Sequence, residues 1–203
     1  MAYSNFKTIE HVTDKFPITV SSGSSLFTDI APADISRSLK EILEEYVPLA
    51  LNINTEKARS EMIVIPVLIE VRKQLERQVS LFSGVDFTVD KALGLNGYCD
   101  FILSGSPDQA FITKPVICMV EAKNESIQGG YGQCMAEMIA AQRFNQGKST
   151  SIEVIWGVVT AGDTWRFLRL EGEHVSIDYD EYNIIQIEKI LGILQYILSL
   201  YLP

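Results

Sequence analysis

The sequence predicts an α/β domain in which a β-sheet is flanked by helices. Helical-period apolar patterns occupy the N-terminal third, strand-like apolar runs separated by turn residues occupy the middle, and a very apolar helical segment closes the chain. The predicted order of elements is α-α-β-β-β-α-β-β-β-α. With 203 residues, 47% hydrophobic and 21% charged, the chain fits one compact globular domain.

Four segments have helical patterns. The first runs from about residue 32 to 46 and is expected to stop before Pro48, because proline disrupts a helix interior. The second spans about 55–78, is apolar on all sides near its middle, and is expected to kink at Pro66. The third, about 131–146, ends before Gly147. The last, about 181–201, is apolar over most of its surface.

Strands are predicted where short apolar runs end in glycine, proline, serine or aspartate. The predicted strands are 16–20, 85–90, 97–104, 115–122, 152–160 and a hairpin of 165–170 with 174–177. Residues 1–54 are therefore expected to form an N-terminal extension with one helix packed on the core. Residues 55–203 are expected to form the main unit, which includes the C-terminal hairpin and helix.

The charge balance argues against strong non-specific binding to nucleic acid. The chain has 26 acidic and 17 basic residues, a net charge of −9. Residues 51–170 are nonetheless nearly neutral, with thirteen acids and twelve bases. Cys99, Cys118 and Cys134 lack zinc-site spacing and are expected to be thiols in a reducing compartment. The chain opens without an apolar signal region, and its most apolar stretch is too short to cross a bilayer. We therefore expect a cytoplasmic protein with no membrane partner.

The strongest functional signal is a pair of carboxylates in strand-like runs. Asp100 lies in Gly-Tyr-Cys-Asp-Phe-Ile-Leu, and Glu121-Ala122-Lys123 follows the run Pro-Val-Ile-Cys-Met-Val. An unpaired charge in such a position is costly to bury, whereas two converging carboxylates suit a hard cation such as Mg²⁺. Strand side chains alternate, so Lys123 is expected on the same face as Glu121. This combination is suited to phosphodiester hydrolysis.

These residues and their order resemble the PD-(D/E)xK nuclease superfamily, which has a restriction-endonuclease-like fold with a mixed sheet core flanked by helices. The resemblance covers about residues 55–160. It implies a Mg²⁺- or Mn²⁺-dependent nuclease acting on DNA. The implied metal ligands are Asp100, Glu121, Glu61 and the carbonyl of Ala122. Lys123 would orient the attacking water or stabilise charge, and Gln133 would position the nucleophile or a phosphate. Two departures are Cys99 before Asp100 and Glu137 in place of tyrosine four residues after Gln133.

Plainer interpretations remain open for each residue. Asp100 would then pair with an arginine, and Glu121 with Lys123 would form an exposed ion pair. Glu61 would be an acid favoured by the helix start, and Gln133 a solvated helix residue. Glu125 and Glu137 are expected on the surface, with a position near the metal as the alternative for either. The run Gly129-Gly130-Tyr131-Gly132 is either a flexible connection or a phosphate cradle.

A second function remains open: a nuclease-fold binding or regulatory module, with weak or no catalysis, that works in a complex. The acidic flanks and the apolar last helix favour it. That helix has more apolar surface than one core contact needs, so we expect a homodimer through the C-terminal helix.

Overall fold

The computed structural model describes residues 2–124, 126–146 and 152–202. Within them, eight strands form a mixed, open sheet in the order β1-β7-β6-β5-β4-β3-β2, with β8 beside β6. The β4–β5 and β1–β7 pairs are parallel and the others are antiparallel. The strands are β1 Thr19–Ser21, β2 Ser80–Asp86, β3 Tyr98–Ser104, β4 Val116–Ala122, β5 Val154–Thr160, β6 Thr164–Glu171, β7 His174–Ile177 and β8 Tyr182–Asn183.

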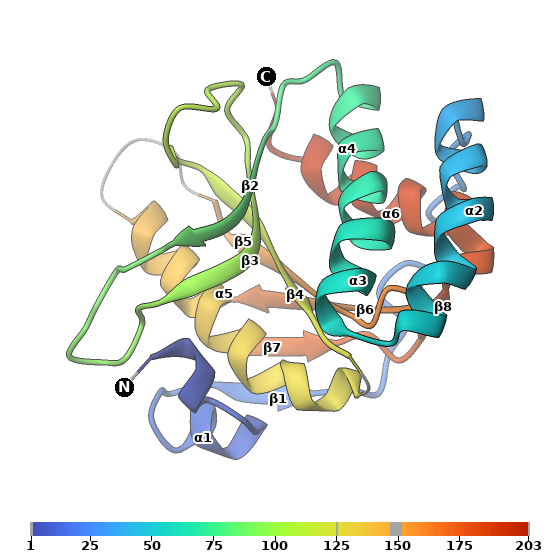
Figure 1. Cartoon of the computed structure of the whole chain (residues 1–203). Helices are drawn as coiled ribbons and strands as arrows, with labels where there is room; N and C mark the ends of the chain where they lie inside the picture. The colour runs from blue at the N-terminus through green and yellow to red at the C-terminus, as the bar shows by residue number, and fades with distance from the viewer. Residues whose placement is uncertain (1, 125, 147–151, 203) are drawn as a thin grey trace.

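Helices cover both faces of this sheet (Figure 1). On one face lie α2 Arg37–Ile53, α3 Glu56–Arg59, the π-helical turn η2 Ser60–Val64, α4 Ile65–Gln74 and α6 Ile187–Ser199. On the other lie α1 Ile9–Thr13 and α5 Tyr131–Asn145. Short 3-10 turns are η1 Tyr3–Asn5, η3 Ile127–Gly130 and η4 Ile184–Gln186. Each face has its own hydrophobic core, so the sheet is buried on both sides.

Helix α5 is buried almost all round, between the sheet and the N-terminal segment. Tyr3, Phe6, Phe16 and Ile18 of that segment pack in the same core as α5. Gly132 permits the close approach, because a Cβ there would meet backbone atoms of Phe6 and Thr8. The N-terminal residues therefore form one wall of the core, and β1 extends the sheet.

Two helix boundaries differ from the sequence expectation. Helix α2 continues through Pro48 to Ile53, because Pro48 is exposed and water can bond the carbonyl that proline leaves unpaired. The expected single helix from 55 to 78 is instead α3, η2 and α4. The expected kink at Pro66 takes the form of the π-helical turn just before it, and Pro66 occupies the first turn of α4.

The first strand of the middle region was placed too late. β2 begins at Ser80 because α4 ends at Gln74, and Glu76 and Arg77 adopt positive φ in the turn between them. Beyond Asp86 the regular ladder stops, and pairing continues only as the hydrogen bond from Phe87 N–H to the Gly97 carbonyl and an isolated bridge between Asp90 and Leu95. The strands β3, β4 and β5 lie within two residues of their predicted limits.

The last helix begins later than predicted and is largely covered. Tyr182–Asn183 forms β8, and Asn183 caps the turn that leads into α6. The apolar residues of α6 are mostly buried in the core: Ile187, Ile190, Leu191, Ile193, Leu194, Ile197 and Leu198. Most of the apolar surface that motivated the homodimer is therefore used within one chain, although Ile185 and Leu200 remain exposed, and the dimer stays a prediction. In the described parts of the chain, no helix combines the length and apolarity needed to cross a bilayer.

Candidate active site

The site begins where β3 and β4 separate. Their paired register ends at Phe101 opposite Val120. Just beyond, the Asp100 carboxylate accepts a hydrogen bond of 2.8 Å from the backbone N–H of Ala122. The Asp100 side chain thus takes the place of a backbone acceptor for the Ala122 N–H, where the pairing of β3 with β4 has ended. Asp100 bonds to a backbone amide rather than to an arginine, so the plainer interpretation of this acid is wrong.

Glu121 and Lys123 lie together at the C-terminal end of β4. They form a direct ion pair, with side-chain exposures of 1% for Glu121 and 22% for Lys123. The amide of Gln133, from the first turns of α5, donates to the other Glu121 oxygen at 2.9 Å. The pair is therefore buried and held on both sides, not an exposed ion pair. The plainer interpretation of Glu121 and Lys123 was thus right about the ion pair and wrong about its exposure. Gln133 is not simply solvated, because its amide bonds to Glu121 and Glu137.

Glu137 lies beside this pair and not on the surface. It is fully buried, one turn after Gln133, whose amide also donates to Glu137 Oε1 at 3.2 Å. Its Oε2 has no hydrogen-bond partner among the described residues. The signal was present, because Glu137 interrupts a run of apolar and small residues from Cys134 to Ala141. Glu125, the other acid expected on the surface, lies outside the described residues.

Burial and mutual repulsion shift the titration of this cluster. Burial, followed by the charge of Asp100, raises the pKa of Glu121 to about 8. Burial and the charge of Glu121 raise the pKa of Glu137 well above its ordinary value. Burial also raises the pKa of Asp100, against the effects of the Ala122 N–H and Lys123. Full ionisation of the three acids is therefore disfavoured, and the cluster keeps protons at pH values at which exposed carboxyl groups would be ionised.

Lys123 is the cation of the cluster. Burial alone would lower its pKa, but Glu121, with Glu56 and Asp100, holds the pKa above its ordinary value. Its side chain packs beside Gly130, where a Cβ would collide with Val159 and press on the Lys123 side chain. Packing therefore accounts for Gly130 and Gly132, whereas nothing among the described residues explains Gly129.

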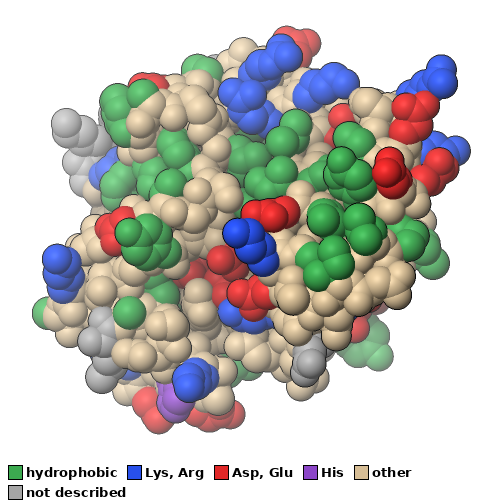
Figure 2. All heavy atoms as spheres, in the orientation of Figure 1, with side chains coloured by type: hydrophobic (Ala, Val, Ile, Leu, Met, Phe, Trp, Pro, Cys, Tyr) green, Lys and Arg blue, Asp and Glu red, His purple; other side chains and the backbone are tan. Residues whose placement is uncertain are grey.

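Glu61 lines the same pocket as Asp100, but it contacts other groups. Its side chain is 62% exposed and forms an ion pair of 3.7 Å with Lys57. The pocket, about 280 Å³, is also lined by Glu56, which the sequence analysis did not single out. Ala122 lines it too. Figure 2 shows acidic and basic side chains side by side in the hollowed middle of this face.

The donor set fits a hard divalent cation of the Mg²⁺ type. In the part of the chain that the structure describes, no group of three or more His, Cys, Asp or Glu side chains has metal-binding geometry. Mg²⁺, however, commonly uses one or two carboxylates and keeps several waters. Asp100 and Glu121 supply two, and the repulsion that raises the pKa of Glu121 would be relieved by a cation.

No model of a known protein family and no curated protein sequence matches this chain. The functional argument therefore depends on the residues of the site and their geometry.

Proposed function

We propose that the chain is a metal-dependent phosphodiester hydrolase with a restriction-endonuclease-like fold, acting on DNA. The observation that carries the proposal is the placement of Asp100, Glu121 and Lys123 where β3 and β4 separate. Asp100 and Glu121 would hold Mg²⁺ or Mn²⁺. The cation, when bound, supplies an activated water and neutralises charge on the phosphate.

The other residues have supporting roles in this proposal. Lys123 offers a positive charge to the phosphate or to the developing oxyanion. Gln133 fixes the Glu121 carboxylate through its 2.9 Å hydrogen bond. Glu61 lines the pocket and is a further ligand only if it leaves Lys57. Glu56 faces the same pocket and raises the pKa of Lys123.

Titration calorimetry with Mg²⁺ and Mn²⁺, beside cleavage assays on single- and double-stranded DNA and on RNA, tests the proposal. Asp100→Asn should abolish metal binding, because the amide is a neutral ligand of nearly the same shape. Lys123→Ala should keep metal binding and lower turnover by about two orders of magnitude or more. Glu61→Gln should have an intermediate effect if Glu61 joins the site. Lys40→Ala, on exposed α2, is the control.

A binding or regulatory module in a complex is the second candidate. The net charge of −9 and the direct contact between Lys123 and Glu121 favour it. Metal binding without cleavage of any of these substrates would select this candidate. A wild-type chain that binds neither metal would contradict both.

A further inference from the structure

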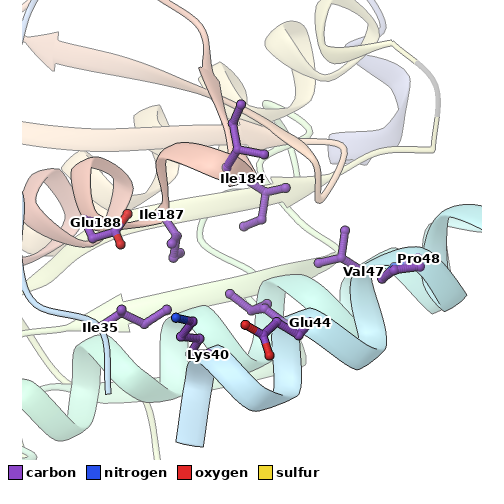
Figure 3. Close-up of a pocket in the computed structure, with 10 residues that line it drawn as sticks. Ile35, Lys40, Glu44, Val47, Pro48, Ile184, Ile187 and Glu188 are labelled. Carbon is purple, nitrogen blue, oxygen red and sulfur yellow. The ribbon is translucent and has the colours of Figure 1, made fainter. Parts of the chain in front are cut away.

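A second pocket lies on another part of the molecule, between α2 and the start of α6 (Figure 3). Its volume is about 480 Å³, and its walls are mainly apolar: Ile35, Leu43, Val47, Pro48, Ile184, Ile185 and Ile187. Lys40, Glu44 and Glu188 complete the lining. We call this set of ten residues the α2–α6 groove. An apolar hollow with a few polar groups is the usual composition of a binding site.

The groove does not bury all of its apolar side chains. Ile184 is 8% exposed, whereas its neighbour Ile185 is 84% exposed. An isoleucine this exposed beside an apolar hollow extends the apolar surface beyond the pocket. An occupant that covers Ile185 as well as filling the hollow buries more apolar surface than a small molecule enclosed by the pocket.

Helix α2 lacks one of its regular backbone hydrogen bonds at this place. Pro48 has no N–H, so the carbonyl of Glu44 lacks its usual partner four residues later. Both residues line the groove. The proline ring thus contributes apolar surface to the wall of the groove in place of a backbone donor.

The charges of the groove favour a basic occupant. Glu44 and Glu188 outnumber Lys40, and neither acid forms an ion pair within the described residues. Lys189, which follows Glu188, does not neutralise the groove acids, because its ammonium donates to the carbonyls of Phe27 and Ile30. A second copy of this chain, with a net charge of −9, would bring acids against acids.

We propose that the α2–α6 groove binds a basic amphipathic helix of another protein, with apolar side chains on one face and lysine or arginine beside them. Apolar anchors would fill the hollow between Val47 and Ile184, as in other helix-in-groove complexes. The basic side chains would pair with Glu44 and Glu188. This function is independent of phosphodiester hydrolysis.

Two fluorescent model peptides of about 15 residues test this interaction by anisotropy with the full chain. Both have leucine on one helical face; one has lysine on the other face and its counterpart has glutamate. The wild type should bind the lysine peptide at micromolar concentration and should not bind the glutamate peptide. The double variant Glu44→Lys/Glu188→Lys should bind the lysine peptide at least about tenfold more weakly and gain affinity for the glutamate peptide. Ile185→Ser should weaken binding of the lysine peptide without changing the charge.

The matched control is Glu153→Lys/Glu173→Lys, which makes the same charge change on two exposed acids. Glu153 precedes β5 and Glu173 follows β6, at the end of these strands that lies away from Ile184 and the groove. It should change the affinity for the lysine peptide by less than about twofold. Equal weakening in both double variants would overturn the proposal, because binding would then follow net charge alone. A wild type that binds neither peptide would also overturn it. So would a dimer in sedimentation that Ile185→Ser abolishes, since a second copy would then occupy the groove.

Discussion

The candidate active site and the α2–α6 groove both combine acids with a lysine, but they differ in burial. Glu121 is 1% and Lys123 is 22% exposed. Glu44, Glu188 and Lys40 are all exposed. Burial strengthens the interaction between Glu121 and Lys123 and raises the pKa of Glu121. The exposed charges of the groove remain free to pair with a partner. The same residue types thus suit chemistry in one place and recognition in the other.

Replacing the lysine of each region should give the largest contrast. Lys123→Ala leaves the buried Glu121 carboxylate without its cation, so the free energy of unfolding near pH 8 should fall by about 2–3 kcal/mol. Lys40→Ala should change it by less than about 0.5 kcal/mol, because Lys40 is exposed. Urea denaturation of both variants measures the difference. Equal effects would mean that burial does not distinguish the two lysines.

The pH dependence of stability should come from the buried acids. The pKa of Glu121 is about 8 in the folded chain, against 4.5 as its ordinary value, and that of Glu137 is also raised. The folded state therefore holds more protons, and the free energy of unfolding should fall as pH rises from about 4.5 through about 8. Glu137→Gln should make this fall shallower. Glu44→Gln is the exposed control, and denaturation at a series of pH values compares them. A fall of wild-type steepness in Glu137→Gln would contradict the assignment.

Two glutamines of α5 give a smaller contrast. Gln133 donates to both Glu121 and Glu137, so Gln133→Ala should lower the free energy of unfolding by about 1–2 kcal/mol. Gln142 donates once, to the Gly172 carbonyl in an exposed turn, and Gln142→Ala should lower it by about 0.5 kcal/mol or less. Thermal denaturation of the two variants is the measurement. The reverse order would show that Gln133 does not hold the buried pair.

The smallest effect is expected at the edge of the site. Lys57 and Glu61 are one turn apart and exposed, with their charges 3.7 Å apart. Lys57→Ala should lower the free energy of unfolding by less than about 0.5 kcal/mol. A loss above about 1 kcal/mol in urea denaturation would show that this pair is coupled to the buried cluster.

The part of the site that depends on strand alternation was predictable from the sequence. Alternation along one strand places Glu121 and Lys123 on the same face. Asp100 and Glu121 come together because β3 and β4 are neighbours in the chain and pair in antiparallel register. The burial of Glu137 depends on how α5 packs against the strands that carry Asp100 and Glu121, which the helical pattern alone does not give. The proximity of Glu56 to Lys123 likewise depends on how α3 packs against the sheet.

For the fold, too, features set by the pattern along the chain were predictable, and features set by contacts between distant segments or by solvent exposure were not. The limits of β3, β4 and β5 were predictable because dense apolar runs end at turn residues. The course of α2 through Pro48 was not, because it depends on whether the proline faces solvent. The N-terminal segment was also hard to predict, since its three-residue strand gains its partner only from β7.

The pairing of β1 with β7 has a consequence for synthesis of the chain on the ribosome. The Thr19 hydroxyl lies 2.8 Å from the imidazole of His174, 155 residues later. Strand β1 therefore emerges early and must wait, unpaired, until nearly the whole chain has been translated. Phe16 and Ile18 wait similarly, because α5 and β7 supply their core. Such distant contacts slow folding and leave an edge open to wrong partners. A nascent chain that ends before His174 would already contain Asp100, Glu121 and Lys123, yet its sheet would remain unfinished.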